Sequence, residues 1–316
     1  KEKHSIPEDM CFTTWEPLLE LPKLADVAII ATMDRDHFGP AMAAIEKGYD
    51  LLLEKPIAPT PEECRKIQLA AEKKGGFVLV CHVLRYTPFY LKIKEIIASG
   101  EIGEAYYAKA IAIRRRAVPT WGVFLNEYEQ GGGPLIDIGT HSLDLTLWIM
   151  DNYKPKYCVG TSYHKLNKDT NQGNAWGNWD PDKFTVEDSA FGFVVLENGA
   201  TINLESAWAL NMLDVREAIT LICGTKAGGD LYDGVRINGI RNNAQYLLKP
   251  NLNPQGAAFY EGANAGDPAS MEAAQWINAV VNDTDPCVLP EQAFTVTRIL
   301  EGIYESAKTG KPYYFD

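Results

Sequence analysis

Three short apolar runs, separated by two helical segments, constrain the fold of this chain more than any other feature. The runs cover residues 25–32, 49–53 and 77–82 and are almost continuously hydrophobic, which is typical of parallel strands covered on both faces. Helices are expected from about Asp36 to Gly48 and from Thr60 to Gly75. Because parallel strands need a crossover connection, this alternation predicts an α/β unit with a parallel sheet and right-handed crossovers.

Ligands of such sheets bind beyond the carboxyl ends of the strands. In this sequence those positions are residues 32–37, 54–56 and 82–85. Lys55 stands between a glutamate and a proline, so its backbone is stiff and we expect its side chain to be paired. A solvated loop lysine is the alternative.

The usual opening of a dinucleotide-binding sheet is missing from this sequence. Such a sheet begins with a strand and a Gly-x-Gly-x-x-Gly turn, followed about twenty residues later by an acidic residue. Neither feature occurs before Ala25, and residues 1–24 resemble the end of a unit whose first strand, helix and second strand are absent. We expect the natural protein to have an opening segment ahead of Lys1; a natural truncation with impaired cofactor binding is the alternative.

The character of the chain changes after residue 103. A helix is expected from Thr87-Pro88 to Gly100, and the following run alternates weakly in polarity, as strands with one wet face do. We therefore predict a partial Rossmann-like domain over residues 1–103. Residues 104–316 are predicted to form an α+β domain with a large, mostly antiparallel open sheet. Further strands are expected at about 105–113, 156–164, 187–196, 200–208 and 216–223, and helices at about 269–282 and 291–307.

A glycine turn followed by a helix carries the most unusual polar residues. Gly131-Gly132-Gly133 permits a tight turn, and Pro134 suits the first turn of the helix that follows. Asp137 and His141 are four residues apart and should share a helix face, which Asp144 extends. The rest of this helix is apolar, so the polar groups should be partly shielded from solvent. In such an environment pKa values shift and acid/base chemistry becomes possible. A buried Asp-His hydrogen bond that joins two layers is the alternative.

Composition excludes several classes of function. The chain has 316 residues, 46% hydrophobic and 23% charged, with a net charge of -12, so nucleic acid is not an expected partner. No apolar run is long enough for a membrane span, and the first residues do not resemble a secretion signal. The six cysteines are scattered without a Cys-x-x-Cys pair, which indicates neither a metal site nor a disulfide framework, but reduced thiols in a cytoplasmic protein.

Two further segments are candidate binding elements. Residues 166–183 form a polar loop with Trp176 and Trp179; a carbohydrate lid is one interpretation, because indole faces stack on sugar rings, and a crossover or subunit contact is the other. Arg114-Arg115-Arg116 is the basic cluster. It fits either a strand with solvated side chains or a clamp for an anionic group.

These features together resemble the glucose-fructose oxidoreductase / inositol dehydrogenase / rhizopine-catabolism family of NAD(P)-dependent enzymes. The matching motifs are the strand at 25–32 with His37, Leu53-Glu54-Lys55-Pro56, Arg85-Tyr86-Thr87-Pro88, and residues 131–144 with their Asp-x-x-x-His. The motifs cover most of the chain from Ala25 to Met150.

The resemblance implies a role for each matching residue. Lys55, Asp137 and His141 would be catalytic and act at one substrate hydroxyl. The cofactor, NAD or NADP, would be contacted by Thr32, His37, Glu54, Lys55, His82 and Arg85. Substrate contacts are expected from Arg116, Trp121, Trp176 and Trp179. The family also implies a cytoplasmic homo-oligomer, a dimer or tetramer, that assembles through its open sheet and acts on sugars, cyclitols and related polyols.

The residues suit the oxidation of a secondary alcohol. Imidazole exchanges protons near neutral pH, so His141 would take the hydroxyl proton, oriented by Asp137, and the Lys55 ammonium would stabilise negative charge on the oxygen. Two alternatives remain open. One is NAD-dependent glycoside cleavage by transient oxidation and elimination. The other is a non-catalytic sugar-sensing regulator, which would be expected to lose the lysine or the histidine.

Overall fold

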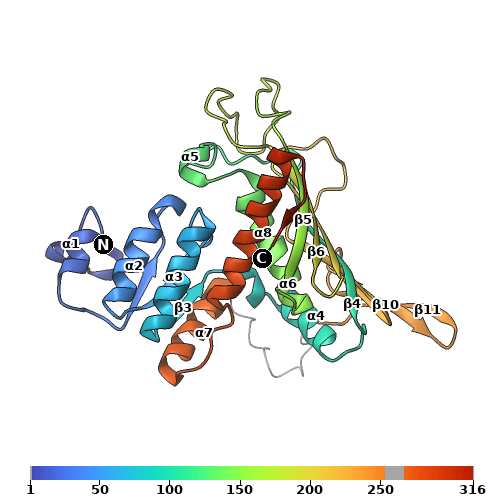
Figure 1. The fold of residues 1–316 in the computed structure, drawn as a ribbon, viewed down its shortest axis with the longest axis horizontal. Helices are drawn as coiled ribbons and strands as arrows, with labels where there is room; N and C mark the ends of the chain where they lie inside the picture. The colour runs from blue at the N-terminus through green and yellow to red at the C-terminus, as the bar shows by residue number, and fades with distance from the viewer. Residues whose placement is uncertain (1, 253–266, 316) are drawn as a thin grey trace. The chain divides into compact units, whose positions relative to one another are not determined.

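The structure is a computed structural model that describes residues 2–252 and 267–315. It divides into two compact units (Figure 1). The first comprises Lys1–Cys81 and Gln275–Phe294, and the second comprises His82–Ala274 and Thr295–Asp316. Each is described by itself below.

The first unit contains the three apolar runs as parallel strands. β1 (Val27–Ile30), β2 (Asp50–Leu53) and β3 (Val78–Val80) pair in the order β1-β2-β3, with Leu51 opposite both Ala28 and Val78. The crossovers are α2 (Phe38–Glu46) and α3 (Pro61–Lys74), and α1 (Glu16–Glu20) precedes β1. The strands and helices share one hydrophobic core, as continuous apolar runs require.

α3 shows why these residues form a helix. Thr60 is extended at the N-cap and its hydroxyl accepts a hydrogen bond from the Glu63 amide, while Pro61 occupies the first turn. The Thr60 hydroxyl also donates to the Glu63 carboxylate, so the Ser/Thr-x-x-Glu spacing acts as a capping motif. The helix ends at Gly75, whose φ of 64° is the left-handed conformation of a C-cap.

Within the described residues, the second unit is built on a nine-stranded sheet in the order β11-β10-β9-β8-β4-β7-β6-β5-β12. All pairs are antiparallel except β4 with β7. The strands are β4 (Ala105–Ile113), β5 (Pro155–Tyr163), β6 (Ser189–Leu196), β7 (Thr201–Ala207), β8 (Ile219–Gly224), β9 (Ala227–Asp230), β10 (Arg236–Arg241), β11 (Ala244–Leu248) and β12 (Tyr313–Tyr314). Its helices are α4 (Pro88–Ala98), α5 (Glu127–Gln130) and α6 (Thr140–Met150). The helices α7 (Pro268–Asn282) and α8 (Pro290–Thr309) each contribute residues to both units.

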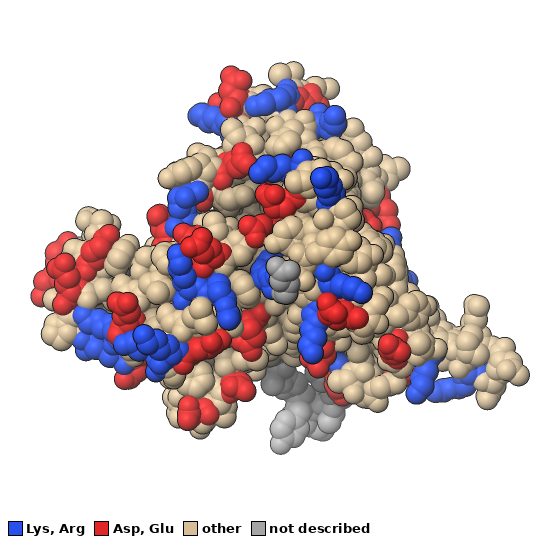
Figure 2. Space-filling view, viewed as in Figure 1, with Lys and Arg blue, Asp and Glu red and all other residues tan. Residues whose placement is uncertain are grey.

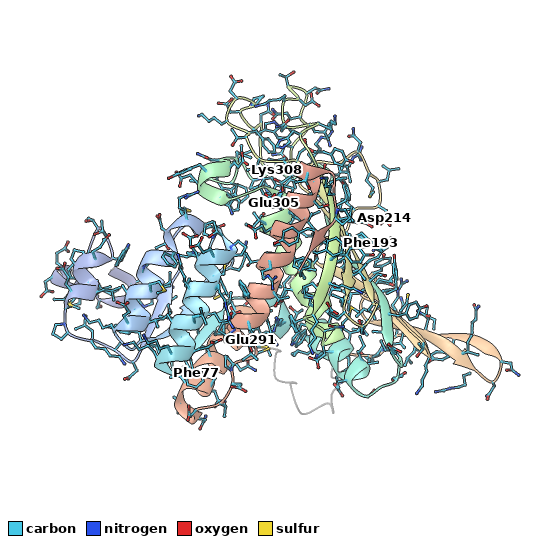
Figure 3. All side chains as sticks on the ribbon, viewed as in Figure 1. Phe77, Phe193, Asp214, Glu291, Glu305 and Lys308 are labelled. Atoms are coloured by element: carbon cyan, nitrogen blue, oxygen red, sulfur yellow. The ribbon has the colours of Figure 1, made fainter. Side chains whose placement is uncertain are left out.

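One face of this sheet is covered by helices (Figure 1). Gly160 on β5 and Gly192 on β6 lie against Ile303 of α8 so closely that a Cβ at either position would overlap it. On the other face side chains are more exposed; Phe193 on β6, labelled in Figure 3, is 40% exposed. The alternation along the strands therefore gives one buried and one open face.

The predicted fold class is confirmed: a parallel Rossmann-like sheet is followed by a large, mostly antiparallel one. The structure divides the chain after Cys81, whereas the sequence analysis placed the boundary at 103. Residues 82–98 belong to the second unit because they pack there; Arg85, for example, pairs with Asp144 of α6. Residues 275–294 join the first unit through the Trp276 side chain, which is in its core.

The distribution of surface charge and the length of the helices bear on the classes of partner. Figure 2 shows Lys and Arg side chains interspersed with Asp and Glu on the face in view, without a continuous basic patch there. No helix within residues 2–252 and 267–315 combines the length and the apolar character that a membrane crossing requires.

Candidate functional site

In the first unit, the candidate residues lie just beyond the carboxyl ends of β1 and β2. Thr32 and Glu54 are exposed, and Lys55 is half-buried. The Lys55 amide donates to the Glu54 carboxylate at 3.2 Å. The arrangement places an ammonium and a carboxylate at the sheet edge where ligands of parallel sheets bind.

His37 is completely buried at this edge. Its Nδ1 lies 2.8 Å from the carbonyl oxygen of Pro56, and its Nε2 lies 3.1 Å from that of Thr32. The imidazole therefore joins the segment after β1 to the segment after β2. With no exposed surface, its ring is closed to direct contact with a cofactor in this structure.

In the second unit, the glycine turn is held by a buried glutamate. Glu187 accepts hydrogen bonds from the amides of Gly133 and Leu135, at 2.8 and 3.1 Å, and from the Tyr304 hydroxyl at 2.8 Å. A Cβ on Gly133 would overlap the carbonyl oxygen of Glu187, so glycine is required there for close approach. Burial raises the pKa of Glu187, and these three donors oppose the shift.

The segment after the glycines is a π-helix, Leu135–Gly139, and becomes α-helical at Thr140. Asp137 lies within the wider π turn, so the α-helical spacing assumed from the sequence does not apply between it and His141. Its Oδ2 accepts a hydrogen bond from the Trp208 indole at 3.1 Å. π-Helical turns are frequent at functional sites, which supports a special role for this segment.

A buried ion pair anchors α6. Arg85 donates from Nε to Asp144 Oδ2 at 2.9 Å and from Nη2 to Oδ1 at 2.5 Å, and both side chains are almost completely buried. The Nη2 also donates to the Tyr153 hydroxyl. The Arg85 side chain is therefore held by protein groups and has no surface exposed for direct contact with a cofactor in this structure.

His82 connects this ion pair to His141. Its Nδ1 is 3.5 Å from Asp144 Oδ2, and its ring stands edge-on to the His141 ring with centroids 6.5 Å apart. His82 is 3% exposed. The structure therefore brings three sequence-predicted residues, His82, Arg85 and His141, together with Asp144.

His141 is half-buried and borders a cavity of about 370 Å³ in the second unit. The rest of the lining is mainly apolar: Val83, Leu84, Ile138, Glu217 and Ala218. An imidazole at the edge of an apolar cavity is placed to exchange a proton with a small bound molecule.

The substrate residues predicted from the sequence fall into two groups. Trp121 and Trp176 are 52% and 43% exposed and pack edge to face. Trp179 is 3% exposed; its indole donates to the Asn167 carbonyl and packs on Phe184. It belongs to the core of the second unit, so its ring is closed to sugar stacking.

Two side chains of the basic cluster, those of Arg114 and Arg116, are paired with protein groups. Arg116 donates to the Asn211 side chain at 2.7 Å and to the Arg115 carbonyl. Arg114 donates to Glu217 at 2.8 Å and covers the Trp176 ring.

The sequence analysis did not identify two residues that hold the site. Glu187 holds the glycine turn and Trp208 holds Asp137. Both contacts join residues more than fifty positions apart, and no local pattern indicates such contacts.

The residues at the carboxyl ends of the parallel strands in the first unit suit contact with part of a dinucleotide. Thr32, Glu54 and Lys55 have accessible side chains beyond parallel strands, where such ligands bind. A glycine-rich turn that would cradle a pyrophosphate does not occur before Ala25. Among the residues that the structure describes, no group of three or more His, Cys, Asp or Glu is arranged for a metal ion.

Comparison with known proteins identifies the scaffold. Residues 1–82 match the oxidoreductase family model with an NAD-binding Rossmann fold, and residues 90–228 match the GFO/IDH/MocA C-terminal domain. A D-glucoside 3-dehydrogenase of Escherichia coli (strain K12) is 32% identical over 285 residues, which is 90% of this chain and 78% of the relative. The chain therefore belongs to the GFO/IDH/MocA family of NAD-binding oxidoreductases, as the resemblance predicted.

Solved structures show the same fold. The aldose-aldose oxidoreductase from Caulobacter crescentus, complexed with glycerol, superposes with a TM-score of 0.77 at 19% identity, covering 99% of this chain and 87% of that one. A levoglucosan dehydrogenase, complexed with NADH and L-sorbose, superposes with a TM-score of 0.81 at 20% identity, covering 96% and 83%.

Proposed function

We propose that this protein is an NAD(P)-dependent dehydrogenase or reductase that acts on a secondary hydroxyl of a sugar, cyclitol or glycoside. The observation that carries the proposal is His141 at the edge of an apolar cavity, on a helix anchored by the Arg85–Asp144 pair. The similarity to a D-glucoside 3-dehydrogenase over 90% of the chain supports the substrate class.

In this proposal, two residues act on the same substrate oxygen. His141 takes the hydroxyl proton during oxidation and returns it during reduction. Lys55 stabilises the negative charge that develops on the oxygen. Asp137, fixed by the Trp208 indole, holds a neighbouring substrate hydroxyl.

The nicotinamide cofactor, when bound, supplies the acceptor for the hydrogen that leaves carbon with its electron pair. Thr32, Glu54 and Lys55 are the residues that would contact it, because their side chains are accessible at the edge of the parallel sheet. His37 would keep Lys55 in place through the Pro56 carbonyl. The same proposal includes a cytoplasmic homo-oligomer that assembles through the open sheet face.

A second candidate activity is glycoside cleavage by transient oxidation. Oxidation of a hydroxyl acidifies a neighbouring C–H, the aglycone leaves by elimination, water adds, and the ketone is reduced again. The exposed Trp121 and Trp176 favour it, because they suit a substrate larger than one ring. Free aglycone released without net reduction of NAD would identify this activity.

The test is a panel of sugars, cyclitols and glycosides with NAD and with NADP, followed by absorbance of reduced nicotinamide and by product analysis. His141→Ala and Lys55→Ala should each lower kcat by about 10²–10⁴-fold. The double variant should be little worse than either single one, because the groups act on one oxygen. If the fold-losses in kcat of the two single variants multiplied in the double variant, the proposal that both groups act on one oxygen would be contradicted.

Matched controls are exposed residues of the same types. His164 and Lys73 are exposed, and His164→Ala and Lys73→Ala should retain wild-type turnover. Near wild-type turnover of His141→Ala would remove His141 from the mechanism. Absence of turnover with every substrate and both cofactors would favour the sugar-sensing regulator.

A further inference from the structure

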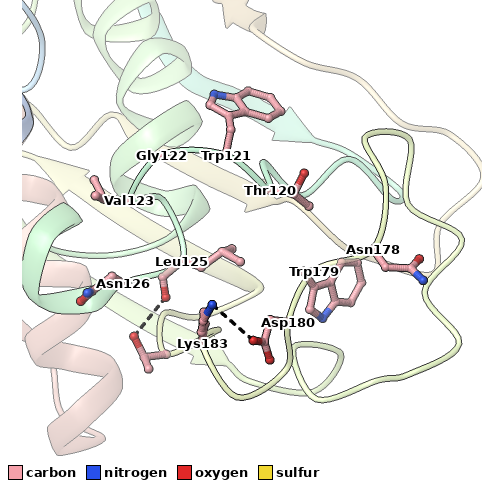
Figure 4. A pocket seen from close by; sticks show the side chains of 11 residues that line it. Thr120, Trp121, Gly122, Val123, Leu125, Asn126, Asn178, Trp179, Asp180 and Lys183 are labelled. Atoms are coloured by element: carbon pink, nitrogen blue, oxygen red, sulfur yellow. Dashed lines mark hydrogen bonds and ion pairs between the residues drawn. The ribbon is translucent and has the colours of Figure 1, made fainter.

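A second cavity in the second unit shares no lining residue with the cavity that His141 borders. Its volume is about 540 Å³, within the range of small-molecule sites. Figure 4 shows its lining. The lining includes Thr120, Trp121, Asn178, Asp180 and Lys183.

The chemistry of the lining suits a ring with apolar faces and polar edges. Trp121 offers an exposed indole beside the cavity, and large exposed aromatic surfaces mark binding sites. Asn178 presents an amide, and Asp180 and Lys183 form an exposed ion pair at 3.7 Å. Amide, carboxylate and ammonium groups are the donors and acceptors that sugar hydroxyls use.

The aromatic wall is preorganised. Asn174 bonds the Val118 backbone in both directions, at 2.8 and 2.9 Å. The Ala175 amide donates to the Arg116 carbonyl, and the Thr120 hydroxyl donates to the Trp176 carbonyl at 2.8 Å. These bonds hold the Trp176 loop on residues 116–120, so Trp121 and Trp176 meet at 5.0 Å between ring centroids.

Two chains of contacts connect this wall to the candidate catalytic helix. Trp176 stacks with Arg114 at 5.2 Å, and Arg114 pairs with Glu217, which lines the His141 cavity. Trp121 packs on Phe124, Phe124 on Trp208, and Trp208 bonds Asp137. All of these residues belong to the second unit.

We propose that the cavity beside Trp121 and Trp176 is a subsite for the second ring of a glycoside, a neighbouring sugar or an aromatic aglycone, while the ring that reacts occupies the His141 cavity. The inference rests on the proposed function, because it assigns the non-reacting part of the same substrate. It accounts for two exposed indoles on segments that four hydrogen bonds join to each other.

The experiment compares the binding of two probes that differ in the second ring. Dissociation constants for 4-nitrophenyl β-D-glucoside and methyl β-D-glucoside are measured by calorimetry with NADH present, so that neither can be oxidised. The wild-type protein should bind the aryl glycoside about ten-fold more tightly. Trp121→Ala and Trp176→Ala should each remove most of this preference, and Trp176→Phe should retain it.

Tyr106 provides the control, because it is also 52% exposed and does not line the cavity. Tyr106→Ala should keep the wild-type preference. Equal affinity for the two probes, failure of both to bind, or a preference that survives both tryptophan variants would overturn the subsite.

Turnover of the same glycosides with NAD tests the proposed function separately. Preferential binding without turnover of any substrate in the panel, with NAD or with NADP, would overturn the proposed function and support the subsite. Turnover with equal affinity for both probes would overturn the subsite alone.

Discussion

Replacing Asp144 with asparagine should strongly destabilise the second unit. Asp144 neutralises Arg85 through two hydrogen bonds, at 2.9 and 2.5 Å, in a place where the two side chains are 2% and 0% exposed. The asparagine side chain would keep the shape but would deprive the buried guanidinium of this counter-charge. Removing one partner of a buried ion pair costs about 3–5 kcal/mol.

Two further contacts of Arg85 do not offset this loss. The Tyr153 hydroxyl accepts one hydrogen bond at 3.1 Å, and the Trp148 ring lies 5.6 Å from the guanidinium carbon. Both interactions are already present in the wild-type protein, so the variant gains nothing from them. The full cost is therefore expected.

The assay is urea unfolding, followed by circular dichroism and by tryptophan fluorescence together, because coincident curves justify a single free energy of unfolding. The double variant Arg85→Met, Asp144→Leu replaces the ion pair with apolar side chains of similar size and should recover most of the loss. A loss below about 1 kcal/mol in Asp144→Asn, or a double variant as unstable as the single one, would refute the reasoning.

Three further predictions concern the glycine turn, the buried carboxylate of Glu187 and the N-cap of α3. Gly133→Ala should lower stability by about 2 kcal/mol or more, measured by urea unfolding, because the new Cβ overlaps the Glu187 carbonyl; an unchanged midpoint would contradict it. Because burial raises the pKa of Glu187 above its ordinary value of 4.5, ionisation of this group makes wild-type stability fall as the pH rises from about 4.5 toward the folded pKa. Glu187→Gln should lack that part of the pH dependence, although its amide also loses a hydrogen bond; parallel pH–stability curves would contradict the assignment. Thr60→Ala should lower the stability of the first unit by about 1 kcal/mol through loss of the cap to Glu63, read from hydrogen exchange of α3 amides, and unchanged exchange would exclude the cap.

The sequence predicted the elements whose signals are local. β1, β2 and β3 follow from apolar runs, and β4 begins and ends as the alternation indicated. The start of α3 follows from Thr60 and Pro61. Local patterns suffice here because strand period, caps and proline act within a few residues.

Features that depend on distant partners were not predictable in this way. The hairpin of β10 and β11 has little buried surface, so it has no hydrophobic pattern to recognise. The burial of Trp179 depends on Asn167 and Phe184, and loop composition alone favoured exposure. The π turn at Asp137 follows a backbone segment that the distant Glu187 holds through the amides of Gly133 and Leu135, and no local pattern predicts that contact.

The π-helical segment Leu135–Gly139 sets the phase of the whole helix that follows. Each residue advances an α-helix by about 100° and 1.5 Å. The π turn holds one residue more than an α turn, so deleting one residue between Pro134 and Thr140 would convert it to an α turn and keep the phase of α6. Inserting one residue directly after Thr140, in the α-helical part, would instead turn Asp144 away from Arg85 and His141 away from its cavity in a single step. Such an insertion should be far more damaging than a side-chain replacement at the same place, because one rotation would displace both the anchor and the proton-exchanging group.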